Sequence, residues 1–167
     1  MFGHIEAFWD IEPIKQLDYK KDFHKDTELI NQYFQSGHSL EHMCLYNFFD
    51  TDTVLPETTQ QIRSLFPGLS CISVAINKFR PGQYLPLHTD LYQRYRMIHS
   101  LKAQQHIRRI IIMIEDCVPG QISQYGRTTW GDWRAGDWFD WVDEVPHAAY
   151  NFSPVDRYTW QVTGVMA

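Results

Sequence analysis

The stretch Ile107-Arg108-Arg109-Ile110-Ile111-Ile112-Met113-Ile114 carries the strongest structural signal in this chain. Its isoleucines are β-branched, and a short apolar run of this kind favours a buried strand over a helix. The stretch lies inside the region 71–167, in which four glycines between 120 and 136 divide the sequence into segments of strand length. The run therefore predicts a β-rich core with a buried strand inside it.

Further strands are predicted on both sides of this run. Segments 71–76 and 84–90 have the composition of two strands joined by a turn at Arg80-Pro81-Gly82-Gln83, and segments 147–152 and 157–165 close the chain. Together with the short segments between the glycines, about seven or eight strands are expected. That number is typical of a β-sandwich or a β-barrel.

The first part of the chain favours helices instead. Apolar residues recur on one face from Asp26 to Gly37, and again from Glu57 to Phe66. The length of 167 residues suits one domain with its own core. We therefore predict a single domain, 1–167, that is mostly β with N-terminal helices: residues 1–70 form a helical buttress and residues 71–167 form the core.

Composition and charge exclude several classes of protein. The net charge is -5 and the sequence holds no basic patch, so we expect no nucleic-acid partner. No apolar run approaches the roughly 20 residues of a membrane span, and the first residues lack the pattern of a signal peptide. The 3 cysteines form no Cys-x-x-Cys unit and indicate free thiols. These features predict a soluble, cytoplasmic protein without membrane contact, and they leave its oligomeric state open.

His88 and Asp90 can offer one imidazole and one carboxylate to a metal ion, because alternate side chains of a strand share a face. His147 belongs to another predicted strand and supplies a second imidazole. Two histidines and one carboxylate leave open positions on the metal, and this set is typical of non-haem Fe(II) oxygenases. We therefore predict His88, Asp90 and His147 as metal ligands and catalytic residues.

Arg157 and Thr159 are the candidate residues for binding a carboxylate. The spacing Arg-x-Thr puts the guanidinium and the hydroxyl on one face of a strand, where both can hold the same carboxylate. This pair follows His147 by about one strand and one turn. We therefore expect it near the predicted metal ligands.

The run Trp133 to Asp140, followed by His147, Asn151 and Arg157, resembles the aspartyl/asparaginyl β-hydroxylase branch of the Fe(II)/2-oxoglutarate-dependent oxygenases. The similarity extends roughly from Ile72 to Val165. The resemblance implies a double-stranded β-helix core, the jelly-roll of cupin-like proteins. It also implies Fe(II), with O2 and 2-oxoglutarate as cosubstrates. The implied reaction hydroxylates an unactivated C–H of an amino-acid or peptidyl substrate and releases succinate and carbon dioxide.

The resemblance also implies roles for single residues. Arg157 and Thr159 would bind the far carboxylate of 2-oxoglutarate. The branch has an Arg-x-His pair that touches the near carboxylate, and Arg108 is the nearest equivalent here, without the histidine. The branch often has glycine where this chain has Asp90, so the full set of three ligands is a departure from it.

The segment 91–106 is polar and too long for a hairpin turn, and it is a candidate lid over the site. Two other functions remain open. One is a cupin-type metal enzyme, such as an isomerase or a dioxygenase without 2-oxoglutarate, in which Arg157 is structural. The other is a jelly-roll module that binds a small ligand and needs no metal.

Overall fold

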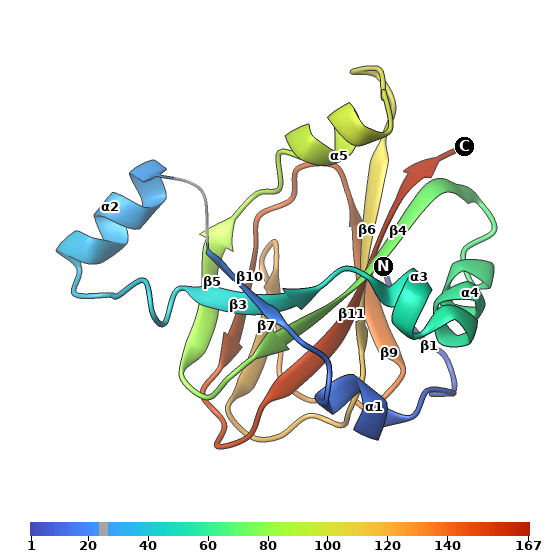
Figure 1. Cartoon of the computed structure of the whole chain (residues 1–167). Helices are drawn as coiled ribbons and strands as arrows, with labels where there is room; N and C mark the ends of the chain where they lie inside the picture. Colours follow the sequence, from blue (N-terminus) through green and yellow to red (C-terminus); the bar gives the residue numbers. More distant parts are fainter. Residues whose placement is uncertain (24–26) are drawn as a thin grey trace.

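The computed structural model describes residues 1–23 and 27–167, which form two facing antiparallel sheets (Figure 1). The large sheet consists of β1 (Phe2–His4), β2 (Lys20–Phe23), β3 (Cys44–Phe48), β4 (Leu69–Phe79), β6 (Ile107–Met113), β9 (Asp137–Val142) and β11 (Arg157–Met166), in the order β1-β9-β6-β11-β4-β3-β2. The small sheet consists of β5 (Gln83–His88), β7 (Gln121–Tyr125), β8 (Thr128–Trp130) and β10 (His147–Asn151), in the order β5-β10-β7-β8. The isoleucine-rich run at 107–114 contains β6, next to the middle strand β11.

The helices of the described residues are short. They are α1 (Ile11–Lys15), α2 (Thr27–Gln35), α3 (Thr51–Val54), α4 (Pro56–Ser64) and α5 (Gln93–Ile98). In Figure 1, α3 and α4 lie together on one side of the sheets, α2 lies on the opposite side, and α5 lies at the top near β6. None of these helices has the length and apolar character needed to cross a membrane.

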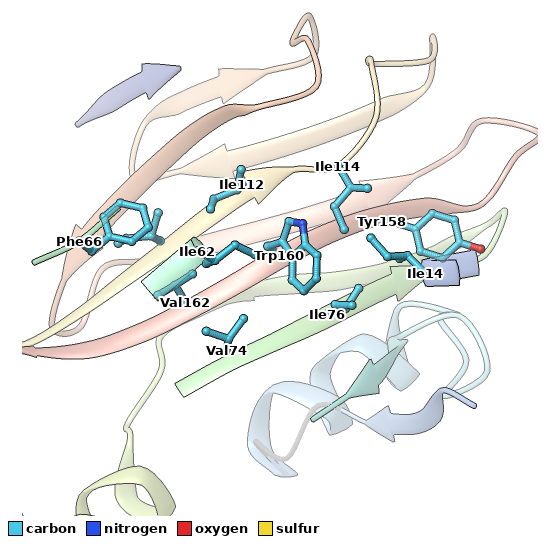
Figure 2. Packing of buried hydrophobic residues seen from close by; sticks show 11 residues of the cluster. Ile14, Ile62, Phe66, Val74, Ile76, Ile112, Ile114, Tyr158, Trp160 and Val162 are labelled. Carbon is cyan, nitrogen blue, oxygen red and sulfur yellow. The ribbon is translucent and has the colours of Figure 1, made fainter. Parts of the chain in front are cut away.

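One face of the large sheet packs against helices through a buried apolar cluster. Side chains alternate along a strand, so every second residue of β4, β6 and β11 points to this face. The completely buried Trp160 lies in the middle of the cluster, with Ile14 of α1 and Ile62 of α4 closing it from the helical side (Figure 2). The other buried members are Phe66, Val74, Ile76, Ile110, Ile112, Ile114, Tyr158 and Val162.

The opposite face of the large sheet is turned to the small sheet. Arg157 and Thr159 of β11 and Arg109 of β6 lie on it, because they alternate with the residues of the apolar cluster. The chain crosses between the sheets repeatedly, for example from β4 to β5 and from β9 to β10. Two facing antiparallel sheets that are joined in this way, and not closed into a barrel, confirm the prediction of a mostly β double-stranded β-helix fold with a few helices.

The first 70 residues differ from the sequence prediction. They contain β1, β2 and β3, which occupy both ends of the large sheet, so this region is more than a helical buttress. These strands have 3, 4 and 5 residues, which is too short for a clear alternation in the sequence. Helix α4 agrees with the predicted segment 57–66, and α2 agrees with the helix predicted up to Gly37, although its expected first residue, Asp26, lies outside the described residues.

Gly136→Ala is expected to destabilise the fold strongly. Gly136 has a φ of +87°, and a Cβ there would lie 1.9 Å from the backbone oxygen of Ile5. No side-chain rotation relieves a clash with backbone, so we expect the free energy of unfolding to fall by at least about 3 kcal/mol in urea denaturation. Gly37 has the same φ of +87° with no atom within 4 Å of its Cβ position, so Gly37→Ala is the matched control. That control should lose only about 1 kcal/mol, and equal losses would contradict the role of the clash.

Candidate metal centre

Two neighbouring strands bring the two predicted histidine ligands together. His88 is the last residue of β5 and His147 is the first residue of β10, and the two residues are directly paired in the antiparallel register. Residues opposite each other on one face of a sheet are close neighbours. The two imidazole rings accordingly have their centroids 4.3 Å apart.

Asp90 completes the group, although it does not lie on a strand as predicted. Strand β5 ends at His88, and the chain turns so that the Asp90 carboxylate meets both imidazoles. The distance is 3.9 Å from His88 Nε2 to Asp90 Oδ1 and 3.7 Å from His147 Nε2 to Asp90 Oδ2. The ligand atoms of the three residues lie within 4.8 Å of one another, so one metal ion can contact all three.

Backbone carbonyls orient both imidazoles. His88 Nδ1 donates a hydrogen bond of 2.7 Å to the carbonyl oxygen of Pro86, and His147 Nδ1 donates one of 2.8 Å to the carbonyl oxygen of Val145. A carbonyl only accepts, so each Nδ1 carries the proton and each Nε2 presents its lone pair. This is the arrangement in which histidine binds metal ions through Nε2.

The charge of Asp90 is maintained by its neighbours. Burial by itself raises the pKa of the Asp90 carboxyl, but the nearby Arg109, the two imidazoles and the Tyr92 hydroxyl together hold it below its usual value. Arg109 Nη2 lies 3.4 Å from Asp90 Oδ2. Even so, this buried oxygen has no hydrogen-bond partner in the described part of the chain. A cation bound between the three ligands would satisfy it, so the donor set fits a divalent metal ion.

The metal-free protein is expected to lose stability as the pH falls from about 6.5 to about 4. Burial and the neighbouring His147 lower the pKa of His88 from 6.5 to about 4. In this window the unfolded chain binds a proton at His88 and the folded chain does not, so acid favours unfolding by up to about 3 kcal/mol. Urea denaturation across this pH range measures the slope. The His88→Ala variant should show a flatter slope, and an unchanged slope would contradict the assignment to His88.

The candidate ligands lie between an open groove and a small internal cavity. The groove has a volume of about 700 Å³, and its lining includes His88, Asp90 and Arg109 together with β2, β3 and the start of the segment 91–106. The cavity has a volume of about 70 Å³ and is lined by all three ligands and also by Arg157 and Thr159. A larger cavity of about 870 Å³ is lined by α1 and the segments 114–118 and 154–158 instead of the ligands.

Arg157 is buried behind the ligands, with 3 % of its surface exposed. Its Nη1 donates to the carbonyl oxygens of Ile122 (2.8 Å) and Tyr150 (3.1 Å), and its Nη2 donates to Ser123 Oγ (2.5 Å). Its guanidinium stacks on the Trp133 ring at 4.7 Å. Burial lowers its pKa to about 10, yet it remains a cation at neutral pH. Within the described residues it forms no ion pair, and its Nε has no hydrogen-bond partner.

Arg108 is turned away from the site. It alternates with Arg109 along β6 and therefore lies on the helix-covered face of the large sheet, where its Nε pairs with Asp140. Arg109 is the arginine that faces the ligands. Sequence reasoning did not separate the two, because the isoleucines that follow occupy both faces of the strand. Tyr92 was also missed, since it lies in a polar segment without a pattern.

Comparisons with known proteins support the fold and go no further. No protein-family model and no curated protein matches this chain. Among solved structures, a putative sugar phosphate isomerase from Acidithiobacillus ferrooxidans is 10% identical over 97% of this chain and 76% of its own, with a TM-score of 0.50. A cupin-superfamily sugar phosphate isomerase from Silicibacter pomeroyi is 10% identical over 88% of this chain and 71% of its own, with a TM-score of 0.48. A predicted oxalate decarboxylase from Thermotoga maritima is 12% identical over 74% of this chain and 82% of its own, with a TM-score of 0.45.

The fold and the site together define the class of this protein. It has a cupin-like double-stranded β-helix fold, and two histidines at one end of its small sheet, with one aspartate just after β5, could hold a metal ion. The resemblance of the sequence to the β-hydroxylase branch gains no support from these structures and stays a prediction.

Proposed function

We propose that this protein is an Fe(II)- and 2-oxoglutarate-dependent dioxygenase that hydroxylates an unactivated C–H of an amino-acid or peptidyl substrate, with succinate and carbon dioxide as co-products. The observation that carries the proposal is the convergence of His88, Asp90 and His147 on a cavity whose lining includes Arg157 and Thr159. The two histidines and the carboxylate are the ligand set that non-haem Fe(II) oxygenases use.

The residues of the chain prepare this centre. His88 and His147 present Nε2 because backbone carbonyls hold their Nδ1 protons, and Arg109 keeps the Asp90 carboxylate ionised. When bound, Fe(II) supplies the redox chemistry that activates O2, with the 2-oxo acid as the source of two electrons. The three side chains would hold the metal ion and leave its other coordination positions to cosubstrate and substrate.

Arg157 supports the cosubstrate assignment through its charge. A buried cation without an acidic partner is unfavourable, and Arg157 has no carboxylate partner within the described residues. The far carboxylate of 2-oxoglutarate would provide one, with Nε of Arg157 as an available donor and Thr159 on the same wall.

The experiment combines binding and turnover. Under anaerobic conditions, Fe(II) and 2-oxoglutarate added to the purified protein should produce the weak visible charge-transfer band of an Fe(II)–2-oxo acid chelate. With O2 and ascorbate, the protein should convert 2-oxoglutarate slowly to succinate without added substrate. Arg108→Gln is the control and should bind 2-oxoglutarate as the wild type does, because Arg108 lies on the other face of β6. Loss of cosubstrate binding in that variant would instead support the assignment of Arg108 to the near carboxylate.

One observation favours a second function, a cupin-type metal enzyme that does not use 2-oxoglutarate. Arg157 already donates hydrogen bonds to two carbonyl oxygens and to Ser123, and these contacts can be its complete role. Tight metal binding in the same titration, without the charge-transfer band and without succinate, would favour this second function.

A further inference from the structure

Tyr92 occupies a strained position directly beside the candidate metal ligands. It follows Asp90 by two residues and begins the segment that leads into α5. Its backbone is left-handed, with φ 51° and ψ 17°, and only 8 % of the residue is exposed. A left-handed conformation costs a residue other than glycine about 1 kcal/mol or more. The contacts of the buried side chain must therefore hold it.

The Tyr92 side chain contacts three residues of the site. Its ring lies 5.2 Å from the guanidinium carbon of Arg109. Its hydroxyl accepts a hydrogen bond of 3.1 Å from Trp141 Nε1, and the same hydroxyl helps to hold the pKa of the neighbouring Asp90 carboxyl below its usual value. Because the indole N–H can only donate, the hydroxyl keeps its own proton available for the Asp90 carboxylate.

Trp141 connects Tyr92 to His147 on β10. Its ring centroid lies 4.3 Å from that of His147, and its N–H is directed to Tyr92. A chain of contacts thus runs from Asp90 through Arg109 to the Tyr92 ring, and from the Tyr92 hydroxyl through the Trp141 indole to His147. The path joins a ligand in a loop to a ligand on β10, which the backbone alone does not connect.

We propose that Tyr92 is a positioning residue whose ring over Arg109 and whose hydroxyl at Trp141 fix Asp90 and His147 relative to each other, so that the three ligands are preorganised before a metal ion binds. The inference rests on metal binding at His88, Asp90 and His147 and is independent of 2-oxoglutarate. It also links the site to the segment 91–106, because Tyr92 is the second residue of that segment. Partners that orient metal ligands in this way contribute a large share of metal affinity.

The test is a titration of metal-free protein with Co(II), followed through the visible ligand-field bands. Tyr92→Phe keeps the ring over Arg109 and removes only the hydroxyl. We expect Co(II) to bind about 10–100-fold more weakly to this variant, with a changed band shape. Tyr95→Phe is the matched control, since the Tyr95 hydroxyl belongs to the same segment but donates to the carbonyl oxygen of Cys71 at 2.6 Å. Its Co(II) affinity and spectrum should equal those of the wild type.

A second variant tests the path itself. Trp141→Phe keeps a ring beside His147 and removes the N–H that meets Tyr92. If the Tyr92 hydroxyl and the Trp141 N–H act through one path, the variant with both substitutions should bind Co(II) about as weakly as the weaker-binding single variant. Additive losses of affinity would contradict a shared path. Near-wild-type Co(II) binding by Tyr92→Phe would overturn the inference and leave the metal site intact. Absence of Co(II) binding by the wild type would instead overturn the metal site and the proposed function with it.

Discussion

His88→Ala is expected to weaken metal binding by more than about 100-fold and to abolish conversion of 2-oxoglutarate to succinate. The loss exceeds the 10–100-fold typical of an outer-shell partner, because a ligand that donates directly to the metal is removed. His88 is held by a local hydrogen bond to the Pro86 carbonyl and lies at the end of β5, so the sheets should remain intact. Isothermal titration with Co(II) and a succinate assay measure the two effects.

Two comparisons sharpen this prediction. Far-ultraviolet circular dichroism of metal-free His88→Ala should match the wild type, which separates loss of a ligand from loss of the fold. Turnover by this variant at the wild-type rate would show that the reaction does not use His88. Asp90→Gly tests the carboxylate: retained turnover would define a two-histidine centre, and lost turnover would assign the metal to all three residues.

Trp160→Ala is expected to lower the free energy of unfolding by about 3–5 kcal/mol. Trp160 is completely buried at the centre of the apolar cluster between the large sheet and the helices (Figure 2). Truncation to alanine removes its packing and leaves a cavity that the surrounding strands cannot close. Urea denaturation of metal-free protein measures the loss.

Trp160→Phe provides the control for size and polarity. The Nε1 of Trp160 has no hydrogen-bond partner in the described residues, so substitution by phenylalanine removes side-chain volume but no hydrogen bond. We expect a loss of less than half that of alanine and an unchanged Co(II) affinity, because Trp160 faces away from the site. A loss as large as that of alanine would indicate that Nε1 makes a contact that stabilises the fold.

Much of the fold was predictable because burial leaves a periodic trace. The segments 71–76, 84–90, 147–152 and 157–165 correspond to β4, β5, β10 and β11, and the isoleucine run corresponds to β6. The short strands have no such alternating hydrophobic pattern in their sequence. β1 and β2 pair with β9 and β3, and only these pairings make them strands.

The candidate site was predictable in its donors and less so in its surroundings. Imidazole and carboxylate groups are recognisable as metal ligands wherever they occur, so His88, Asp90 and His147 could be selected from their residue types and spacing. The structure brings these three side chains together, although Asp90 reaches the site from the loop after β5. The assignments of Arg157, Thr159 and Arg108 to 2-oxoglutarate remain predictions.

The sequence alone determined that the chain forms a β-rich core and which side chains can donate to a metal, because hydrophobic periodicity and donor chemistry are local properties. Only the tertiary structure decided that His88 faces His147, that Arg109 rather than Arg108 meets the ligands, and that Tyr92 lies buried between them. The register between β5 and β10 sets the first of these, and the face of β6 that packs on the helices sets the second. Both depend on pairing between segments far apart in the chain. A shift of one residue in either strand pairing would turn these side chains to the opposite face of their sheet.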